Sequence, residues 1–312
     1  MTPAIDLIDL HKRYGRRTAV DSLSLTVEPG TVFGLIGPNG AGKTTTLRLI
    51  LDIIRPTSGA VRVLGEDPRS GGPSLRRRIG FVPGELRLDG RMTGRRLLDF
   101  YTGVSGPVPA GRIDRLSARL GLDLTRRVGT LSKGNKQKLG IVQAFMHEPE
   151  LLVLDEPTSG LDPLVQREFL QLVREARDRG QTVLLSSHVL SEIQQAADTV
   201  AVLSAGRLVA EGDVSSLRLG AVRRVRAGFD DVDAEELRRE LQLIPHLADV
   251  EITRADGSAR LSATVEGDID PFVKTIARHR LTDLSVEEPD LEESVLRLYG
   301  SPHPSAEEAG HA

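Results

Sequence analysis

The sequence predicts an α/β fold in which helices cover both faces of a parallel sheet. Short runs of four to six aliphatic residues alternate with stretches of helical spacing along the first two thirds of the chain. Uninterrupted apolar strands of this kind are typical of parallel sheets, because these are buried on both sides. Near residue 218 the pattern changes to the order β, α, β, β, α, β. That order predicts a second, small α+β domain of the ferredoxin-like type.

The elements of the larger domain follow from hydrophobic spacing and from the residues that end it. Residues 24–37 read as two strands around a Pro-Gly turn, and residues 44–54 have a helical spacing that Pro56 ends. A Gly- and Pro-rich stretch, residues 102–111, separates two further helices. The other predicted strands are 60–65, 151–156, 182–187 and 199–204, and the other predicted helices are 95–101, 113–122, 135–147, 164–178 and 189–197.

The elements of the smaller domain are predicted from the same hydrophobic spacing. After them we expect one more helix at residues 290–300, followed by polar residues that we expect to be disordered. We therefore predict a large domain at 1–217, a small accessory or dimerisation domain at 218–300, and a disordered tail at 301–312. The predicted strands of the small domain are 221–230, 249–255, 258–266 and 281–288, and its helices are 233–241 and 270–279.

The composition excludes several classes of function. The chain has 312 residues and a net charge of −3, which argues against a general nucleic-acid-binding protein. It has no cysteine, so a disulfide, a thiolate zinc site or a thiol nucleophile is excluded. We expect no signal peptide, and no apolar window approaches the ~20 residues that cross a bilayer. A role at a membrane would therefore need another chain to supply the membrane-spanning part.

A phosphate-binding loop is predicted at residues 37–44, GPNGAGKT, which fit the pattern G-x-x-x-x-G-K-[ST] between an apolar strand and a helix. The glycines let successive N–H groups face a phosphate, and the helix N-terminus adds a positive field. We expect Lys43 between the β- and γ-phosphates and the Thr44 hydroxyl on Mg²⁺. A plain glycine-rich turn is the alternative, but few chance matches carry both flanking elements. The predicted nucleotide-binding residues here are Gly37, Pro38, Asn39, Gly40, Ala41, Gly42, Lys43, Thr44 and Thr45.

Two adjacent acids, Asp155 and Glu156, follow a predicted buried strand, and a phosphate site of this kind needs a carboxylate there to hold its metal ion. The buried strand in LLVLDEP, residues 151–157, places Asp155 at its carboxyl end, where open α/β sheets bind their ligands. A lone acid there could be a helix cap, but two adjacent acids are costly unless a cation or a reacting group uses them. We assign Asp155 to Mg²⁺ through water and Glu156 as the general base that polarises the attacking water. These features predict a P-loop NTPase.

Further motifs, in the right order, resemble those of ATP-binding-cassette (ABC) ATPases over roughly residues 4–215. LSKGNKQKLG, residues 131–140, lies about twenty residues before the acid pair, where that family carries its signature, usually LSGGQ. Tyr14 resembles the aromatic residue that stacks on adenine, and Asp162 in SGLD resembles the D-loop aspartate. His188 resembles the switch histidine, although a lone histidine after a strand is more often structural. The resemblance implies an ABC-type nucleotide-binding domain with ATP and Mg²⁺ as its ligands.

The resemblance also implies a head-to-tail pair of cassettes, in which each ATP lies between the phosphate loop of one chain and the signature of the other. Ser132 and the N–H of Gly134, at an exposed helix N-terminus, suit an anionic γ-phosphate. Lys133 and Asn135 stand where the family usually has Gly and Gln. The lysines of residues 131–140 would be attracted to a nucleotide that carries about four negative charges. In the alternative interpretation this segment is an ordinary capped helix whose lysines are solvated.

One departure from the family pattern concerns IGFVPGEL, residues 79–86. The family usually has a glutamine after this proline, but Gly84 takes that place here and Glu85 follows. Either Glu85 substitutes for the glutamine or hydrolysis proceeds without it. The Pro-Gly-Glu variant, the SKG signature and the added C-terminal domain resemble the drug- and antibiotic-exporting branch of the family.

We therefore expect an ATP-hydrolysing subunit that drives efflux of drugs, antibiotics or other small hydrophobic compounds through a separate permease. It would work as a homodimer on the cytoplasmic face of the membrane, with no nucleic acid as a partner. The alternative is a soluble ABC ATPase that acts on nucleic acid or ribosomes, but such proteins usually carry two cassettes or long coiled-coil insertions. For the C-terminal domain we favour a dimer-stabilising role over ligand sensing.

Overall fold

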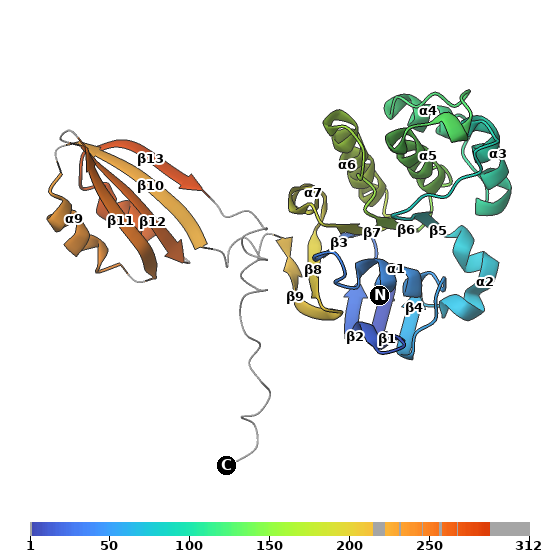
Figure 1. The fold of residues 1–312 in the computed structure, drawn as a ribbon, viewed down its shortest axis with the longest axis horizontal. Helices are drawn as coiled ribbons and strands as arrows, with labels where there is room; N and C mark the ends of the chain where they lie inside the picture. The colour runs from blue at the N-terminus through green and yellow to red at the C-terminus, as the bar shows by residue number, and fades with distance from the viewer. Residues whose placement is uncertain are drawn as a thin grey trace, which may run out of the picture. The chain divides into compact units, whose positions relative to one another are not determined.

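The computed structural model describes residues 2–214, 222–230, 232–244, 246–255, 258–266 and 268–287. The chain divides into two compact units, residues 1–212 and residues 213–312, each described here by itself (Figure 1). The predicted boundary at residues 217 and 218, the predicted helix at 290–300 and the predicted tail lie outside the described residues. No helix in the described part of the chain is both long and apolar enough to cross a membrane.

The first unit contains the predicted parallel sheet. Its six strands lie in the order β5-β6-β7-β3-β8-β9, and the pairs β5–β6, β6–β7, β7–β3 and β3–β8 are parallel. β3, β6 and β7 are buried along their whole length, as their continuous aliphatic runs predict. The strands are β3 Val32–Ile36, β5 Ile79–Val82, β6 Leu151–Asp155, β7 Thr182–Ser187, β8 Thr199–Ser204 and β9 Arg207–Asp213.

The helices of the first unit begin at residues that suit helix starts. Ser132, Asp162 and Thr93 accept hydrogen bonds from backbone N–H groups of the first turn, as N-caps do. Figure 1 shows α5 and α6 on one side of the parallel sheet, and α1 with a second sheet on the other side. The helices are α1 Lys43–Ile50, α2 Pro68–Arg77, α3 Gly94–Ser105, α4 Arg112–Arg119, α5 Lys133–Phe145, α6 Pro163–Asp178 and α7 Leu190–Ala196, with a 3₁₀ turn at Val128–Thr130.

The first unit also contains a second sheet, which was not predicted from the sequence. It is antiparallel, with the strand order β2-β1-β4, and its strands are β1 Ile5–Tyr14, β2 Arg17–Val27 and β4 Ser58–Val63. Their side chains alternate between buried and exposed, which is the pattern of a sheet with one covered face. β1, α2, β5 and β9 were also not predicted as elements.

The second unit has the predicted ferredoxin-like order. Its elements run β10, α9, β11, β12, α10, β13, and the four strands form an antiparallel sheet in the order β11-β12-β10-β13. Phe229, Phe272 and Leu261 are buried in its own hydrophobic core. The α/β fold with a small α+β unit is therefore confirmed. The bounds are β10 Val222–Asp230, α9 Ala234–Leu241, β11 Leu247–Ala255, β12 Ser258–Glu266, α10 Asp270–Ile276 and β13 Leu281–Glu287.

Candidate functional site

The phosphate loop joins the end of β3 to the start of α1, at the carboxyl edge of the parallel sheet. Gly42 is the N-cap of α1 and has φ +106°, and a Cβ there would lie 2.6 Å from the carbonyl oxygen of Ala19. A Cβ at Gly37 would lie 2.3 Å from the carbonyl oxygen of Leu203. Only glycine fits both positions. No side chain caps α1, so its first N–H groups stay available to an anion.

Lys43 lies inside this loop and is only 6% exposed. Its Nζ donates to the carbonyl oxygens of Gly37 at 2.6 Å and Pro38 at 3.4 Å. It also lies 3.6 Å from Oε1 of Glu156. A buried ammonium held mainly by two loop carbonyls is well placed to exchange one of these contacts for phosphate oxygens.

Asp155 lies at the end of β6 and is 2% exposed. Its Oδ1 accepts hydrogen bonds from the hydroxyls of Ser186 at 2.7 Å and Thr44 at 3.2 Å. The Thr44 and Asp155 oxygens are thus adjacent, and oxygen ligands of this kind are those that Mg²⁺ prefers, with waters completing its shell. These residues fit a bound Mg²⁺. Among the described residues no cluster of three or more acids or histidines forms a protein-only metal cage.

Glu156 is held in an unusual backbone conformation, with φ +47°. Its N–H donates to the carbonyl and the hydroxyl of Ser186, both at 3.2 Å. Its Oε2 lies 2.5 Å from Nδ1 of His188, and the His188 N–H donates to the same oxygen at 3.4 Å. A non-glycine residue at positive φ is costly, and such strained residues are enriched at functional sites; of the nine that the described residues contain, Glu156 is the one that lines the cavity.

These residues surround one open cavity of about 550 Å³, which is large enough for a nucleoside triphosphate. Tyr14 lies at its edge, about half exposed, with Nζ of Lys12 5.0 Å from the ring centroid. Arg17, Ala19 and Ser159 also line it and were not predicted. The predicted residues that line the cavity are Tyr14, Pro38, Asn39, Gly40, Ala41, Gly42, Lys43, Thr44, Thr45, Gly84, Asp155, Glu156 and His188.

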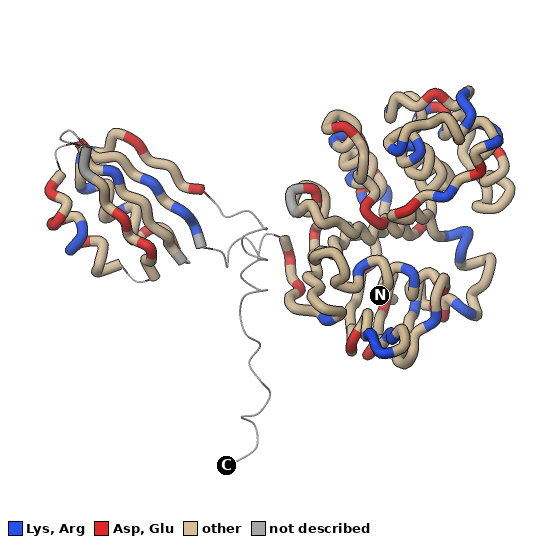
Figure 2. Tube along the Cα trace, in the orientation of Figure 1, with Lys and Arg blue, Asp and Glu red and all other residues tan. Residues whose placement is uncertain are grey.

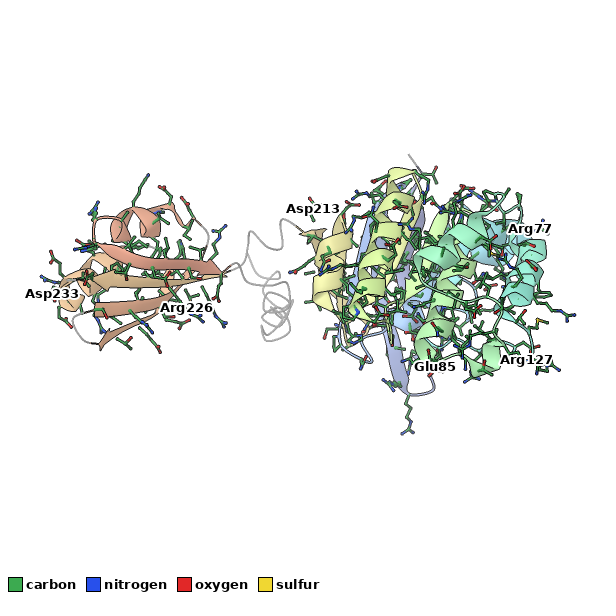
Figure 3. The ribbon with its side chains drawn as sticks, turned by 90° about the horizontal axis from the view of Figure 1, so that it is seen from above. Arg77, Glu85, Arg127, Asp213, Arg226 and Asp233 are labelled. Atoms are coloured by element: carbon green, nitrogen blue, oxygen red, sulfur yellow. The ribbon has the colours of Figure 1, made fainter. Side chains whose placement is uncertain are left out.

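The structure separates the two residues of the Pro-Gly-Glu variant. Gly84 lines the cavity, and a Cβ on it would lie 3.2 Å from Oδ2 of Asp155. Glu85 lies outside the cavity, is 84% exposed and has its carboxylate 3.8 Å from Arg87 (Figure 3). In this conformation Glu85 does not take the place of a glutamine beside the acid pair.

The signature segment contributes no lining residue to the cavity and packs on the residues that follow the acid pair, among them Ser159 at the cavity wall. Ser132 caps α5 by accepting from the N–H of Asn135 at 3.3 Å. The Lys133 Nζ donates to the Ser159 hydroxyl at 3.0 Å, and a Cβ on Gly134 would lie 2.5 Å from the carbonyl oxygen of Gly160. None of the residues 132–135 lines the cavity of its own chain.

The D-loop residue Asp162 serves as the N-cap of α6, because its side chain accepts from the N–H of Val165 at 3.1 Å. Glu192 is a buried carboxylate that was not predicted from the sequence. It links Thr158, which follows the acid pair, to Ser187, the residue before His188. Its Oε2 accepts from the hydroxyls of Thr158 at 2.8 Å and Ser187 at 2.9 Å. Ser186, Ser187 and Glu192 all flank His188 in TVLLSSHVLSE, so proximity in sequence was the available signal.

The comparisons with known proteins agree with this geometry. The family model described as "ABC transporter" matches residues 20–159. A bacitracin transport ATP-binding protein BcrA of Bacillus licheniformis is 40% identical over 68% of this chain and 70% of its own length. A BcrA of Enterococcus faecalis is 34% identical over 96% of this chain and 97% of its own length. A solved ATP-binding subunit of an ABC transporter, 32% identical, matches 70% of this chain and 92% of its own, with a TM-score of 0.64.

Proposed function

Because the chain belongs to the ABC transporter family as an ATP-binding subunit, we propose that it drives export of amphiphilic antibiotics through a separate permease. It hydrolyses ATP, as the ATP-binding subunits of this family do. The observation that carries the proposed role of the site is the common cavity of the phosphate loop, the acid pair and His188. The soluble alternative acting on nucleic acid is not favoured, since the relatives reported above are named for transport.

The residues have distinct proposed roles in hydrolysis. Lys43 and the N–H groups at the start of α1 hold the phosphates, and the Tyr14 ring stacks on the adenine of the nucleotide. Thr44 and Asp155 would hold Mg²⁺, which would neutralise part of the charge of the bound phosphates. Glu156 accepts the proton of the attacking water, and His188 orients the Glu156 carboxylate through the 2.5 Å contact.

The signature is proposed to complete the site of a second copy of the chain. Ser132, Lys133, Gly134 and Asn135 do not line the cavity of their own chain, although Lys133 donates to Ser159, which does. A head-to-tail homodimer would bring the α5 N-terminus of one chain to the γ-phosphate bound by the other. Closure on ATP and release after hydrolysis would then transmit work to the permease.

The exported compound is proposed from the relatives alone. Both BcrA proteins are named for bacitracin transport, and the Enterococcus protein matches nearly the whole chain. We therefore propose a peptide antibiotic or a similar amphiphile as the cargo. The protein would act on the cytoplasmic face of the membrane, held there by its permease.

A two-part experiment tests this proposal. The tagged chain is purified from detergent-solubilised native membranes, and a stoichiometric polytopic membrane protein is the expected companion. Cells that express both chains should tolerate more bacitracin than cells with the permease and the Glu156→Gln variant. Recovery only with ribosomal proteins or nucleic acid would contradict the exporter function, whereas a permease without any bacitracin effect would overturn only the cargo.

A further inference from the structure

Glu192, the third residue of α7, is a buried carboxylate that the catalytic roles proposed above do not use. Its side chain is only 5% exposed, and among the described residues no lysine, arginine or histidine forms an ion pair with it. Figure 2 shows an acidic position and no basic one on α7, whose sequence is LSEIQQA. A carboxylate that loses its hydration without a cationic partner is costly, so its hydrogen bonds must compensate.

The hydrogen bonds of Glu192 join two segments that are distant in the sequence. Its Oε2 accepts from the hydroxyl of Thr158 at 2.8 Å and from the hydroxyl of Ser187 at 2.9 Å. Thr158 and Ser187 are both buried. Because the acceptor is charged and water is excluded, these bonds are stronger than bonds between neutral groups. Glu192 therefore ties the chain after β6 to the end of β7.

The first of these segments carries Glu156. Thr158 follows it by two residues, in a turn where the Ser159 N–H donates to the Glu156 carbonyl at 3.2 Å. Glu156 itself has the strained φ of +47°. A strained residue keeps its conformation only when its surroundings hold it, and the bond of Thr158 to Glu192 is one such restraint.

The second segment carries His188. The Oγ of Ser187, the residue before it, donates to Glu192, and the N–H of Val189, the residue after it, donates to the same Oγ at 2.9 Å. The His188 side chain is 57% exposed, so little packing holds the ring itself. Its position depends on the backbone on either side, which the Ser187 hydroxyl and Glu192 fix.

We propose that Glu192 is a positioning residue for ATP hydrolysis, which holds His188 against Glu156 by joining Ser187 to Thr158. With the 2.5 Å contact between His188 and Glu156, these residues close a ring of contacts beside the cavity. Glu192 does not line the cavity, so it acts through the other residues. This inference rests on the proposed function, because it assumes that Glu156 is the general base.

A purely structural role for Glu192 makes different predictions. An acid in the first turn of α7 stabilises the helix through its dipole, and α7 has no side-chain cap. That role would affect the stability of the protein without a selective effect on kcat. The geometry favours positioning, since Oε2 bonds hydroxyls of two other segments.

The test compares Glu192→Met, which keeps the length of the side chain but removes the strong acceptor, with Glu192→Gln, whose amide oxygen can still accept both bonds. Glu192→Met should lower kcat about 10- to 100-fold, because small displacements of reacting groups are costly. Its ATP affinity should stay within about twofold of the parent, and Glu192→Gln should keep kcat within about fivefold. Phosphate release by the full chain, binding of a fluorescent ATP analogue and thermal melting measure these quantities. An equal loss of kcat in both variants, or none in Glu192→Met, would overturn the proposal.

A second variant removes the hydroxyl on the other side of the bond. Thr158→Val should lower kcat about 3- to 10-fold in the parent and should have little effect in Glu192→Met, since the two residues act through one contact. Thr182→Val is the matched control, because Thr182 is a buried threonine at the far end of β7 whose hydroxyl accepts from the Gly30 N–H at 3.0 Å. It should lower the melting temperature and leave kcat unchanged. Additive losses for Thr158→Val and Glu192→Met, or a loss of kcat in Thr182→Val as large as in Thr158→Val, would contradict positioning.

The Glu156→Gln background separates this inference from the proposed function. Without the base, Glu192→Met should not lower the residual hydrolysis of radiolabelled ATP any further, whereas general damage to the fold would lower it again and overturn the proposal. If Glu156→Gln hydrolyses ATP like the parent chain, the proposed base is refuted and this inference falls with it. If Glu156→Gln is inactive but Glu192→Met is like the parent, only the positioning role fails.

Discussion

Two helix N-termini of this chain are built differently, although both are proposed to hold phosphate. At α1 the cap is Gly42 in a left-handed conformation, no side chain caps the helix, and a lysine, two acids and a histidine surround the opening. At α5 the cap is Ser132, whose hydroxyl already accepts the Asn135 N–H. The α1 N-terminus lines a cavity of its own chain, whereas the α5 N-terminus packs on residues 159–160, of which Ser159 lines that cavity, and contributes no lining residue itself.

The difference supports the proposal that the two helix N-termini have different roles, α1 in holding the nucleotide of its own chain and α5 in contacting the γ-phosphate of a partner chain's nucleotide. At α1 the free N–H groups and Lys43 provide binding energy. At α5 the cap satisfies one donor, so the remaining N–H groups and Lys133 can add only a smaller, later interaction. Variants of the first helix and its acids should therefore affect binding or chemistry strongly, and variants of the second should affect turnover alone.

The largest effect is expected from Glu156→Gln. Removal of the general base should lower kcat by about 10²- to 10⁴-fold, because a positioned base contributes that much to proton transfer. ATP affinity should be unchanged or higher, since the substitution removes a negative charge near the γ-phosphate. Phosphate release and equilibrium binding of a fluorescent ATP analogue measure the two quantities. Turnover like that of the parent chain would exclude Glu156 as the base.

A smaller effect is expected from Ser132→Ala, about 10- to 100-fold in kcat with unchanged nucleotide affinity of the monomer. This variant also loses a helix cap, which costs about 0.5–2 kcal/mol of stability. Ser132→Asp is the matched control, because aspartate keeps the cap but places a negative charge against the γ-phosphate. It should be as inactive as Ser132→Ala or more so, while its melting temperature stays close to that of the parent.

Acid should weaken the contact between α4 and α6 before it weakens the phosphate loop. Hydrogen bonds from Arg119 on α4 to Glu175 on α6 lower the pKa of Glu175 to about 2 from its usual 4.5. Since the folded pKa is the lower one, this contribution is complete above about pH 4.5 and is lost as the pH falls toward 2. Between pH 5 and pH 3 the protection of α4 and α6 against hydrogen exchange should fall more than that of β3. Arg119→Gln should remove this pH dependence.

The smallest effect is expected from Glu85→Gln, less than about twofold in kcat, because an exposed surface pair contributes little. The Glu85 side chain points into solvent beside Arg87 and not into the cavity. A tenfold loss would instead mean that Glu85 reaches the acid pair in the closed dimer. The same ATPase assay decides between the two.

The sequence predicted the parts of this site that depend on local pattern. The glycines at 37 and 42 are required by close backbone contacts, and the apolar run before Asp155 forms the buried strand β6. What it did not predict depends on contacts between distant segments. Ser186 holds both acids, Glu192 joins Thr158 to Ser187, and Arg17 reaches the cavity from β2. The antiparallel sheet was missed because the alternation in β2 is short and a register shift interrupts β1.

The central claim is that the signature acts on the nucleotide of a partner chain, and a mixing experiment tests it most directly. Lys43→Ala chains and Ser132→Ala chains are assayed for ATP hydrolysis separately and then as an equimolar mixture. If the signature acts in trans, each mixed dimer contains one intact site, and activity should rise to about a quarter of that of the parent chain for independent sites. If the signature acts within its own chain, the mixture will show only the mean of the two inactive preparations, which would contradict the account.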